Sequence, residues 1–328
     1  MNDHESAVDA PLANVDSAHH LSSTRDREAG PPWSRVFAAA LFVIAVAAGF
    51  SYLMSEDSVE RGERDPKAVE EEMLASLAAL VRPDIFRRMV LMSAPYGGPP
   101  SVPFDTANAS PATGKGTDIH AALAALPRPR KHYQWYYSTR PANENMWKAR
   151  QGLHAFLRAY YHHKSADWKA NKPYELKGWT AEELAKMPTY YIMDLSEGMA
   201  ETVAKEMPSA AEIAANVWLP EAELKVYSDE YARTGFQGGL QWYRVRTSGR
   251  FDAELELFSG RTIDVPQTFI AGASDWGIHQ GPGAMERMQK VACTNMKEIH
   301  LIPGAGHWVQ QEKPDEVNRL LLEFLSKS

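Results

Sequence analysis

The chain has 328 residues, of which 44% are hydrophobic and 23% are charged, so it can bury one substantial core. Its net charge of -7 and the absence of a basic stripe interleaved with aromatic residues exclude the usual composition of a nucleic-acid-binding protein. The single cysteine, Cys293, permits no internal disulfide, and we interpret it as a buried structural thiol near the end of a helix. His19 and His20 lack further ligands at a useful spacing, so no metal or cofactor site is predicted.

The N-terminal part of the chain contains two contrasting segments. Residues 1–32 are polar with almost no aromatic or branched apolar side chains, which predicts a disordered tail. Residues 36–54 carry no charge over 19 positions, enough for one helix across a bilayer. A buried helix or a cleaved signal peptide is the alternative, but the polar residues before this segment and the missing cleavage pattern favour an uncleaved anchor. We therefore expect a single-pass membrane protein, and basic residues balanced on both sides leave its orientation open.

A charged linker at 56–67 separates this segment from the rest of the chain. From Ala68 a helical pattern leads into an apolar run ending at Ser93, which predicts a helix followed by a strand. The prolines and glycines at 95–100 then mark an exit from a sheet.

A long helical region follows, in which amphipathic patterns predict helices at 146–161 and 220–233. Most of its many aromatic side chains are expected to pack in its core. His162 and His163 lie at the predicted end of the first of these helices, and we expect both to be exposed.

Two strand-and-loop patterns near the C-terminus carry the chemistry. The apolar run 265–270 delivers Asp275 onto a loop, and a second run, 298–302, ends in a glycine-rich bend that presents His307. A predicted helix at 283–292 joins the two strands, and such a crossover makes them parallel neighbours with both loops at one sheet edge. The carboxylate can then orient and stabilise the imidazole as in a hydrolytic triad.

This pair of loops resembles the last two triad members of the α/β-hydrolase superfamily, and most of all those of its epoxide-hydrolase branch. In that branch a lid is inserted before the acid-bearing strand, and two lid tyrosines donate hydrogen bonds to the epoxide oxygen. The resemblance implies these roles for Tyr133, in His-Tyr-Gln-Trp-Tyr-Tyr, and for Tyr243, in Leu-Gln-Trp-Tyr-Arg. It extends from about Leu80 to the C-terminus. Without it, either tyrosine would be interpreted as a packing residue, and Gly-His-Trp as part of a surface loop.

The nucleophile and the oxyanion donors of the family have no counterpart in the sequence. The family's Gly-x-Asp-x-Gly elbow lies about 13 residues before the equivalent of Arg82, and counting back reaches Val69. Asp65 lies nearby, but it has neither the flanking glycines nor a preceding apolar strand, so we interpret it as a linker charge. The His-Gly-x-Pro oxyanion motif is absent as well.

The predicted fold class is therefore α/β, with a partial α/β-hydrolase core of about three parallel strands and a mainly helical lid, preceded by the tail and the transmembrane helix. The implied function is hydrolysis of a small apolar epoxide or ester-like substrate, impaired in this chain, which we interpret as an incomplete or alternatively spliced hydrolase with a membrane segment where the first half of the core is expected. A membrane-tethered noncatalytic binding protein, or a half-site completed by a partner chain, is the alternative. The expected divisions are 1–32 (tail), 33–55 (membrane helix), 56–67 (linker), 68–105 (core), 106–262 (lid) and 263–328 (core).

Overall fold

The computed structural model of the protein describes residues 71–99, 118–250 and 252–327. The predicted tail and the predicted membrane segment at 36–54 lie outside these ranges. Among the helices of the described residues, none combines the length and apolar composition needed to cross a bilayer.

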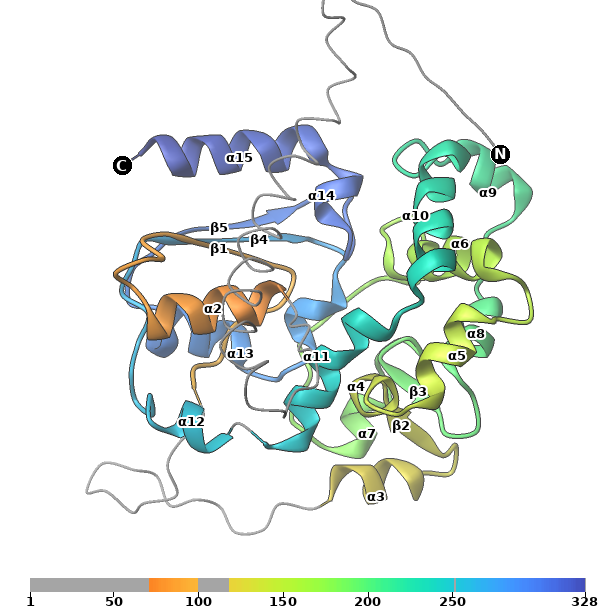
Figure 1. Cartoon of the computed structure of the whole chain (residues 1–328), viewed down its shortest axis with the longest axis horizontal. Helices are drawn as coiled ribbons and strands as arrows, with labels where there is room; N and C mark the ends of the chain where they lie inside the picture. Colours follow the sequence, from red (N-terminus) through yellow and green to blue (C-terminus); the bar gives the residue numbers. More distant parts are fainter. Residues whose placement is uncertain (1–70, 100–117, 251, 328) are drawn as a thin grey trace, which may run out of the picture.

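Three parallel strands form the main sheet, in the order β1 (Met89–Met92), β4 (Gln267–Gly272) and β5 (Met296–Ile302) (Figure 1). All six residues of β4 are buried, as expected for a central strand covered on both faces. Its pairing with β5 confirms the predicted parallel neighbours. In the described part of the chain, β1 pairs on one side only, with β4.

Helices cover both faces of this sheet (Figure 1). One face is covered by α2 (Glu71–Val81), α13 (Ala284–Arg287) and the π-helix η2 (Met288–Ala292), which continues α13. On this face Leu80 of α2 and Met288 of η2 pack with Leu91 and Phe269 of the sheet. Val309 of α14 (Val309–Glu312) and Val317 of α15 (Pro314–Ser326) pack with Ile270 and Ile302 on the other. The helices α13 and η2 lie between β4 and β5, where a crossover helix was predicted. The short helix α12 (Asp252–Glu256) precedes β4.

The lid lies beside the sheet and consists of short helices around the antiparallel pair β2 (Arg130–His132) and β3 (Ile192–Asp194), which the sequence did not predict (Figure 1). The predicted helix at 220–233 is confirmed by α10. The single helix predicted at 146–161 is wrong, because Gly152 adopts φ 84°, a left-handed value that interrupts a right-handed helix. The lid helices are α3 (Ile119–Ala124), α4 (Tyr133–Tyr137), α5 (Pro141–Trp147), α6 (Leu153–Lys164), α7 (Ala181–Leu184), α8 (Met199–Ala204), α9 (Ala210–Ala215), α10 (Glu221–Thr234) and α11 (Gln237–Ser248).

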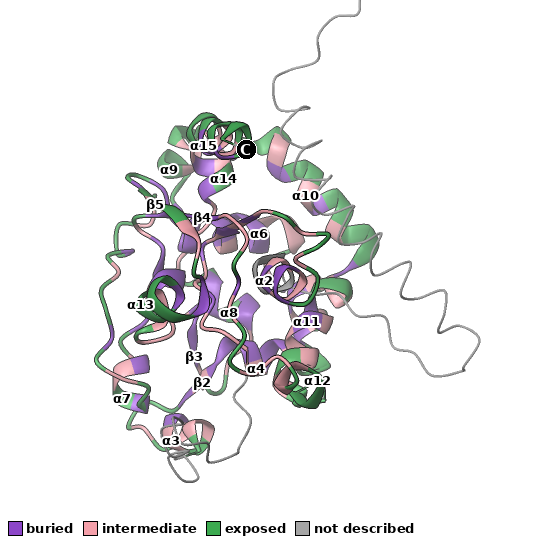
Figure 2. Cartoon of the chain, turned by 90° about the vertical axis from the view of Figure 1, so that its left-hand side faces the viewer, coloured by how far each residue is buried: buried purple, intermediate pink, exposed green. Residues whose placement is uncertain are grey.

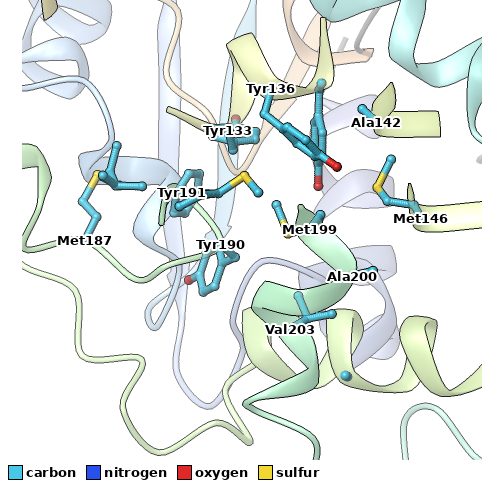
Figure 3. Close-up of a cluster of buried hydrophobic side chains, with 14 of the residues drawn as sticks. Tyr133, Tyr136, Ala142, Met146, Met187, Tyr190, Tyr191, Met199, Ala200 and Val203 are labelled. Carbon is cyan, nitrogen blue, oxygen red and sulfur yellow. The ribbon is translucent and has the colours of Figure 1, made fainter. Parts of the chain in front are cut away.

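The lid has a core of its own, rich in tyrosine and methionine. Tyr133, Tyr136, Tyr190 and Tyr191 come together there with Met199, as Figure 3 shows. In Figure 2 the buried residues gather inside the molecule, while exposed residues cover outer helices such as α10 and α15. The aromatic residues expected to pack therefore do so.

The prediction that His162 and His163 are exposed is wrong. Both side chains are buried at the end of α6. The His163 ring lies edge-on to Trp168 and Tyr190, with centroids 4.4 and 4.7 Å away. Burial lowers the pKa of His163 to about 3, with smaller contributions from His162 and Lys164. The neutral ring is thus a packing element of the lid at physiological pH.

Candidate active site

Asp275 and His307 meet at the edge of the sheet where β4 and β5 end. The Nδ1 atom of His307 lies 3.2 Å from both carboxylate oxygens of Asp275. The Asp275 side chain is 1% exposed and that of His307 is 20% exposed, so the imidazole is reachable while its partner is not. A proton on Nδ1, facing the carboxylate, leaves Nε2 as the nitrogen that can take a proton from a reactant.

Glycines allow the two loops to approach each other. A Cβ atom at Gly272 would collide with the carbonyl oxygens of Ala305 and Gly306 in the His307 loop. One at Gly277 would lie 2.8 Å from the carbonyl oxygen of Ser93 and 3.0 Å from the Asp275 carboxylate oxygens. The Gly277 N–H instead donates to Asp275 Oδ1 over 2.7 Å, which fixes the carboxylate at the start of the 3-10 helix η1 (Trp276–His279).

Ser93 joins the same edge from β1. It has φ 64°, a left-handed value that is uncommon for any residue other than glycine. Its hydroxyl donates to the backbone carbonyl of His307 over 3.2 Å and so supports the loop from the sheet side. This contact was not predicted from the sequence. In the described chain, the His307 ring has Asp275 as its only hydrogen-bonding partner, so Ser93 is not aligned as a nucleophile.

The C-terminal end of α6 supports the His307 loop from the lid side. The His307 N–H donates to the carbonyl of Lys164 over 3.0 Å, and the Trp308 indole N–H donates to the carbonyl of Tyr161 over 2.9 Å. Both acceptors belong to the last turn of the helix, whose carbonyls have no partner within the helix. These two hydrogen bonds join the His307 loop to the lid.

Tyr133 and Tyr243 also lie together, with ring centroids 5.9 Å apart and ring planes at 72°. The Tyr133 hydroxyl donates to Gln280 Oε1 over 3.3 Å and accepts from Gln134 Nε2 over 3.2 Å. Gln280 directly follows η1, so this lid tyrosine is linked to the loop that carries Asp275. An O–H donor usually lies 2.5–3.0 Å from its acceptor, so the bond to Gln280 is long.

A cavity of about 410 Å³ lies between the loop after β1 and the lid, and His132 and Gln134, on either side of Tyr133 in the chain, line it. Gln134 and Gln280, the partners of the Tyr133 hydroxyl, line it together with Trp179 and Tyr96. Its volume falls in the range of small-molecule sites. The candidate residues Tyr133, Tyr243, Asp275 and His307 are not among its lining residues.

Two further observations limit the chemistry of the described residues. His132 is buried next to Tyr133, and burial lowers its pKa to about 3, with smaller contributions from Arg246 and His120. This imidazole therefore stays neutral and uncharged near pH 7. In the part of the chain that the structure describes, no cluster of three or more His, Cys, Asp and Glu side chains could hold a metal ion.

The parallel sheet, the acid and histidine loops at its edge and the helical lid together define part of an α/β-hydrolase fold. Solved structures share this arrangement. The chain is similar to an epoxide hydrolase from an endophytic Streptomyces, with a TM-score of 0.56, 25% identity, and coverage of 78% of this chain and 65% of that one. It is also similar to epoxide hydrolase A from Mycobacterium thermoresistibile, with a TM-score of 0.54 and 27% identity. That match covers 78% of this chain and 66% of the other one.

Comparison of sequences leads to the same group of proteins. No family model matches the chain. It is 44% identical over 112 residues to epoxide hydrolase A of Mycobacterium tuberculosis, covering 33% of this chain and 32% of that protein. It is 33% identical over 117 residues to epoxide hydrolase 1 of Siraitia grosvenorii, covering 34% of this chain and 36% of that protein. The chain thus spans about a third of the length of these curated relatives, and the likenesses support an epoxide-hydrolase-like α/β-hydrolase.

Proposed function

We propose that the chain carries the base, the orienting acid and the lid donors of an epoxide-hydrolase-type site. The contact between His307 Nδ1 and the buried carboxylate of Asp275, over 3.2 Å, is the observation that carries this proposal. The proximity of Tyr133 and Tyr243, predicted from the same resemblance, supports it. The substrate would be a small apolar epoxide or ester-like molecule.

In the complete site, a carboxylate attacks an epoxide carbon and the carbon–oxygen bond breaks, giving an alkyl ester. The hydroxyls of Tyr133 and Tyr243 would donate hydrogen bonds to the departing oxygen, one of them would give it the proton that makes it a hydroxyl, and solvent would return a proton to that tyrosine. His307 would then take a proton from water as the water oxygen attacks the ester carbonyl, while Asp275 stabilises the imidazolium. Collapse of the tetrahedral intermediate breaks the ester carbon–oxygen bond, the leaving oxygen takes the proton from the His307 imidazolium, and the diol and the free carboxylate are released.

We further propose that the chain does not turn over epoxides unaided. The sequence lacks Gly-x-Asp-x-Gly and His-Gly-x-Pro motifs, and the described residues place no nucleophile against the His307 ring. Loss of the nucleophile in a triad enzyme typically lowers turnover by around six powers of ten. A noncatalytic protein that retains the lid as a binding surface is the second candidate, favoured by this same missing nucleophile.

Diol formation from an aromatic epoxide tests the proposal of inactivity. The purified 328-residue chain and its His307→Gln variant are both expected to give only the uncatalysed rate. Saturable diol formation that His307→Gln abolishes would overturn this proposal and the noncatalytic candidate together. Asp65 would then be the first carboxylate to examine as the nucleophile.

A further inference from the structure

Glu312, at the end of α14, connects the His307 loop to the lid through its buried carboxylate. Its Oε2 atom accepts the N–H of Ala166 over 2.8 Å and that of Gly306 over 3.0 Å. Its Oε1 atom accepts the N–H of Trp308 over 3.1 Å. The side chain thus receives three backbone donors, two of which flank His307.

The loop and the end of α6 form a cradle for this carboxylate. The N–H groups of Gly306 and Trp308 point to Glu312, and the His307 N–H between them points to the Lys164 carbonyl. Three backbone N–H groups, from Ala166, Gly306 and Trp308, therefore converge on one carboxyl group. The acceptor is a side chain of the protein itself.

The balance of forces on Glu312 shows that these donors matter. Burial raises the pKa of Glu312 to about 7, and the charge of Asp167 acts in the same direction. The N–H groups of Ala166, Gly306 and Trp308 oppose this shift, because each stabilises the ionised form. Removing the carboxylate would leave the buried N–H of Gly306 and the part-buried N–H groups of Ala166 and Trp308 without this acceptor, and for the buried donor the cost exceeds the net value of the bond.

We propose that Glu312 is a positioning residue for His307, holding its backbone so that the ring meets Asp275; the catalytic meaning of that position rests on the function proposed above. The ring cannot keep its 3.2 Å contact with Asp275 unless the peptide units on both sides of His307 stay in place. Ser93 supports the carbonyl of His307 from β1, and Glu312 supports the neighbouring N–H groups from α14 while it also accepts the lid N–H of Ala166. Glu312 therefore fixes the base and the lid as one unit.

Glu312→Ala in the full chain tests this proposal without any need for turnover. Two readouts apply: amide hydrogen exchange in the His307 loop, and the ¹⁵N signals of the imidazole, which show whether Nδ1 carries the proton. We expect exchange to accelerate at least about tenfold and the fixed Nδ1–H signal to be lost. Glu312→Gln, which keeps one acceptor oxygen, should be intermediate and covers the case in which the alanine variant does not fold.

Two controls separate positioning from general destabilisation. Glu316→Ala removes the same side chain from an exposed site on α15 and should change neither readout. Val317→Ala weakens the core under β4 and β5 and should lower the unfolding midpoint while the imidazole signal stays as in the wild type. The proposal would be overturned if Glu312→Ala kept the amide exchange rates and the imidazole tautomer of the wild type. It would also be overturned if Val317→Ala changed both of these readouts as Glu312→Ala does. Diol formation by the chain would overturn the proposed inactivity and would leave both of these readouts, and the inference about Glu312, unchanged.

Discussion

Gly306→Ala tests how closely the His307 loop is packed against the lid. A Cβ atom at this position would lie 2.6 Å from the carbonyl carbon of Ser165 and 2.7 Å from both Lys164 O and Ala166 N. Ordinary van der Waals contacts of a Cβ atom lie at 3.4–4 Å, so these backbone atoms must move by roughly an ångström.

The cost follows from what that movement breaks. Overpacking of this kind costs about 1–3 kcal/mol. The shift also disrupts the bonds from Gly306 N–H to Glu312 and from His307 N–H to Lys164, each with a net value of about 0.5–1.5 kcal/mol. We therefore expect the free energy of unfolding to fall by about 2–6 kcal/mol, and the Asp275–His307 contact to loosen.

Urea unfolding of the wild type and the variant measures this difference. The matched control is Gly239→Ala in α11, where an added Cβ meets nothing within 4 Å and the backbone is helical. That substitution should raise stability by about 0.5–1 kcal/mol, because alanine suits a helix better than glycine. If the free energy of unfolding of Gly306→Ala lay within about 0.5 kcal/mol of the wild-type value, the reasoning about the loop would be wrong.

Three other features lead to separate predictions. The pKa of His163 is about 3 in the folded protein and near 6.5 in the unfolded chain, so its contribution to stability is present above pH 6.5 and lost as pH falls toward 3. This one group accounts for about 1.4 kcal/mol per pH unit in that window, so urea titrations of His163→Phe should show a slope shallower than that of the wild type by this amount, and equal slopes would contradict this. Burial raises the pKa of the Cys293 thiol to about 12, so a disulfide reagent at pH 8 should react only after denaturant is added, and reaction of the native protein would count against a structural thiol. The uncharged segment 36–54 should keep the protein in the membrane pellet during alkaline carbonate extraction, whereas release would argue against an anchor.

The sheet edge could be predicted from the sequence because its signals are local. Apolar runs that end in glycine mark β4 and β5, and a helix-length segment between them requires a parallel crossover. That topology alone brings Asp275 and His307 together, 32 residues apart in the chain. Tyr133 and Tyr243 carried no comparable signal, and only the family resemblance singled them out.

The contacts that position the site could not be predicted, because they depend on distant parts of the chain. The hydroxyl of Ser93 reaches a carbonyl 214 positions away, and the carboxylate of Glu312 reaches an amide 146 positions away. The burial of His163 depends on Trp168 and Tyr190 closing over a helix end that looks exposed when read alone. At Gly152 a single backbone conformation interrupted a continuous amphipathic pattern.

Binding of an aromatic epoxide tests most directly whether the lid tyrosines form a substrate site. Calorimetric titration of the wild type with styrene oxide should give saturable binding, weakened about 5- to 150-fold by combined Tyr133→Phe and Tyr243→Phe, since two hydrogen bonds are worth about 1–3 kcal/mol together. Tyr136→Phe, which removes a hydrogen bond to Asn145 inside the lid, is the matched control and should bind as the wild type does. Equal affinity of the double variant and the wild type would contradict an epoxide site at these tyrosines.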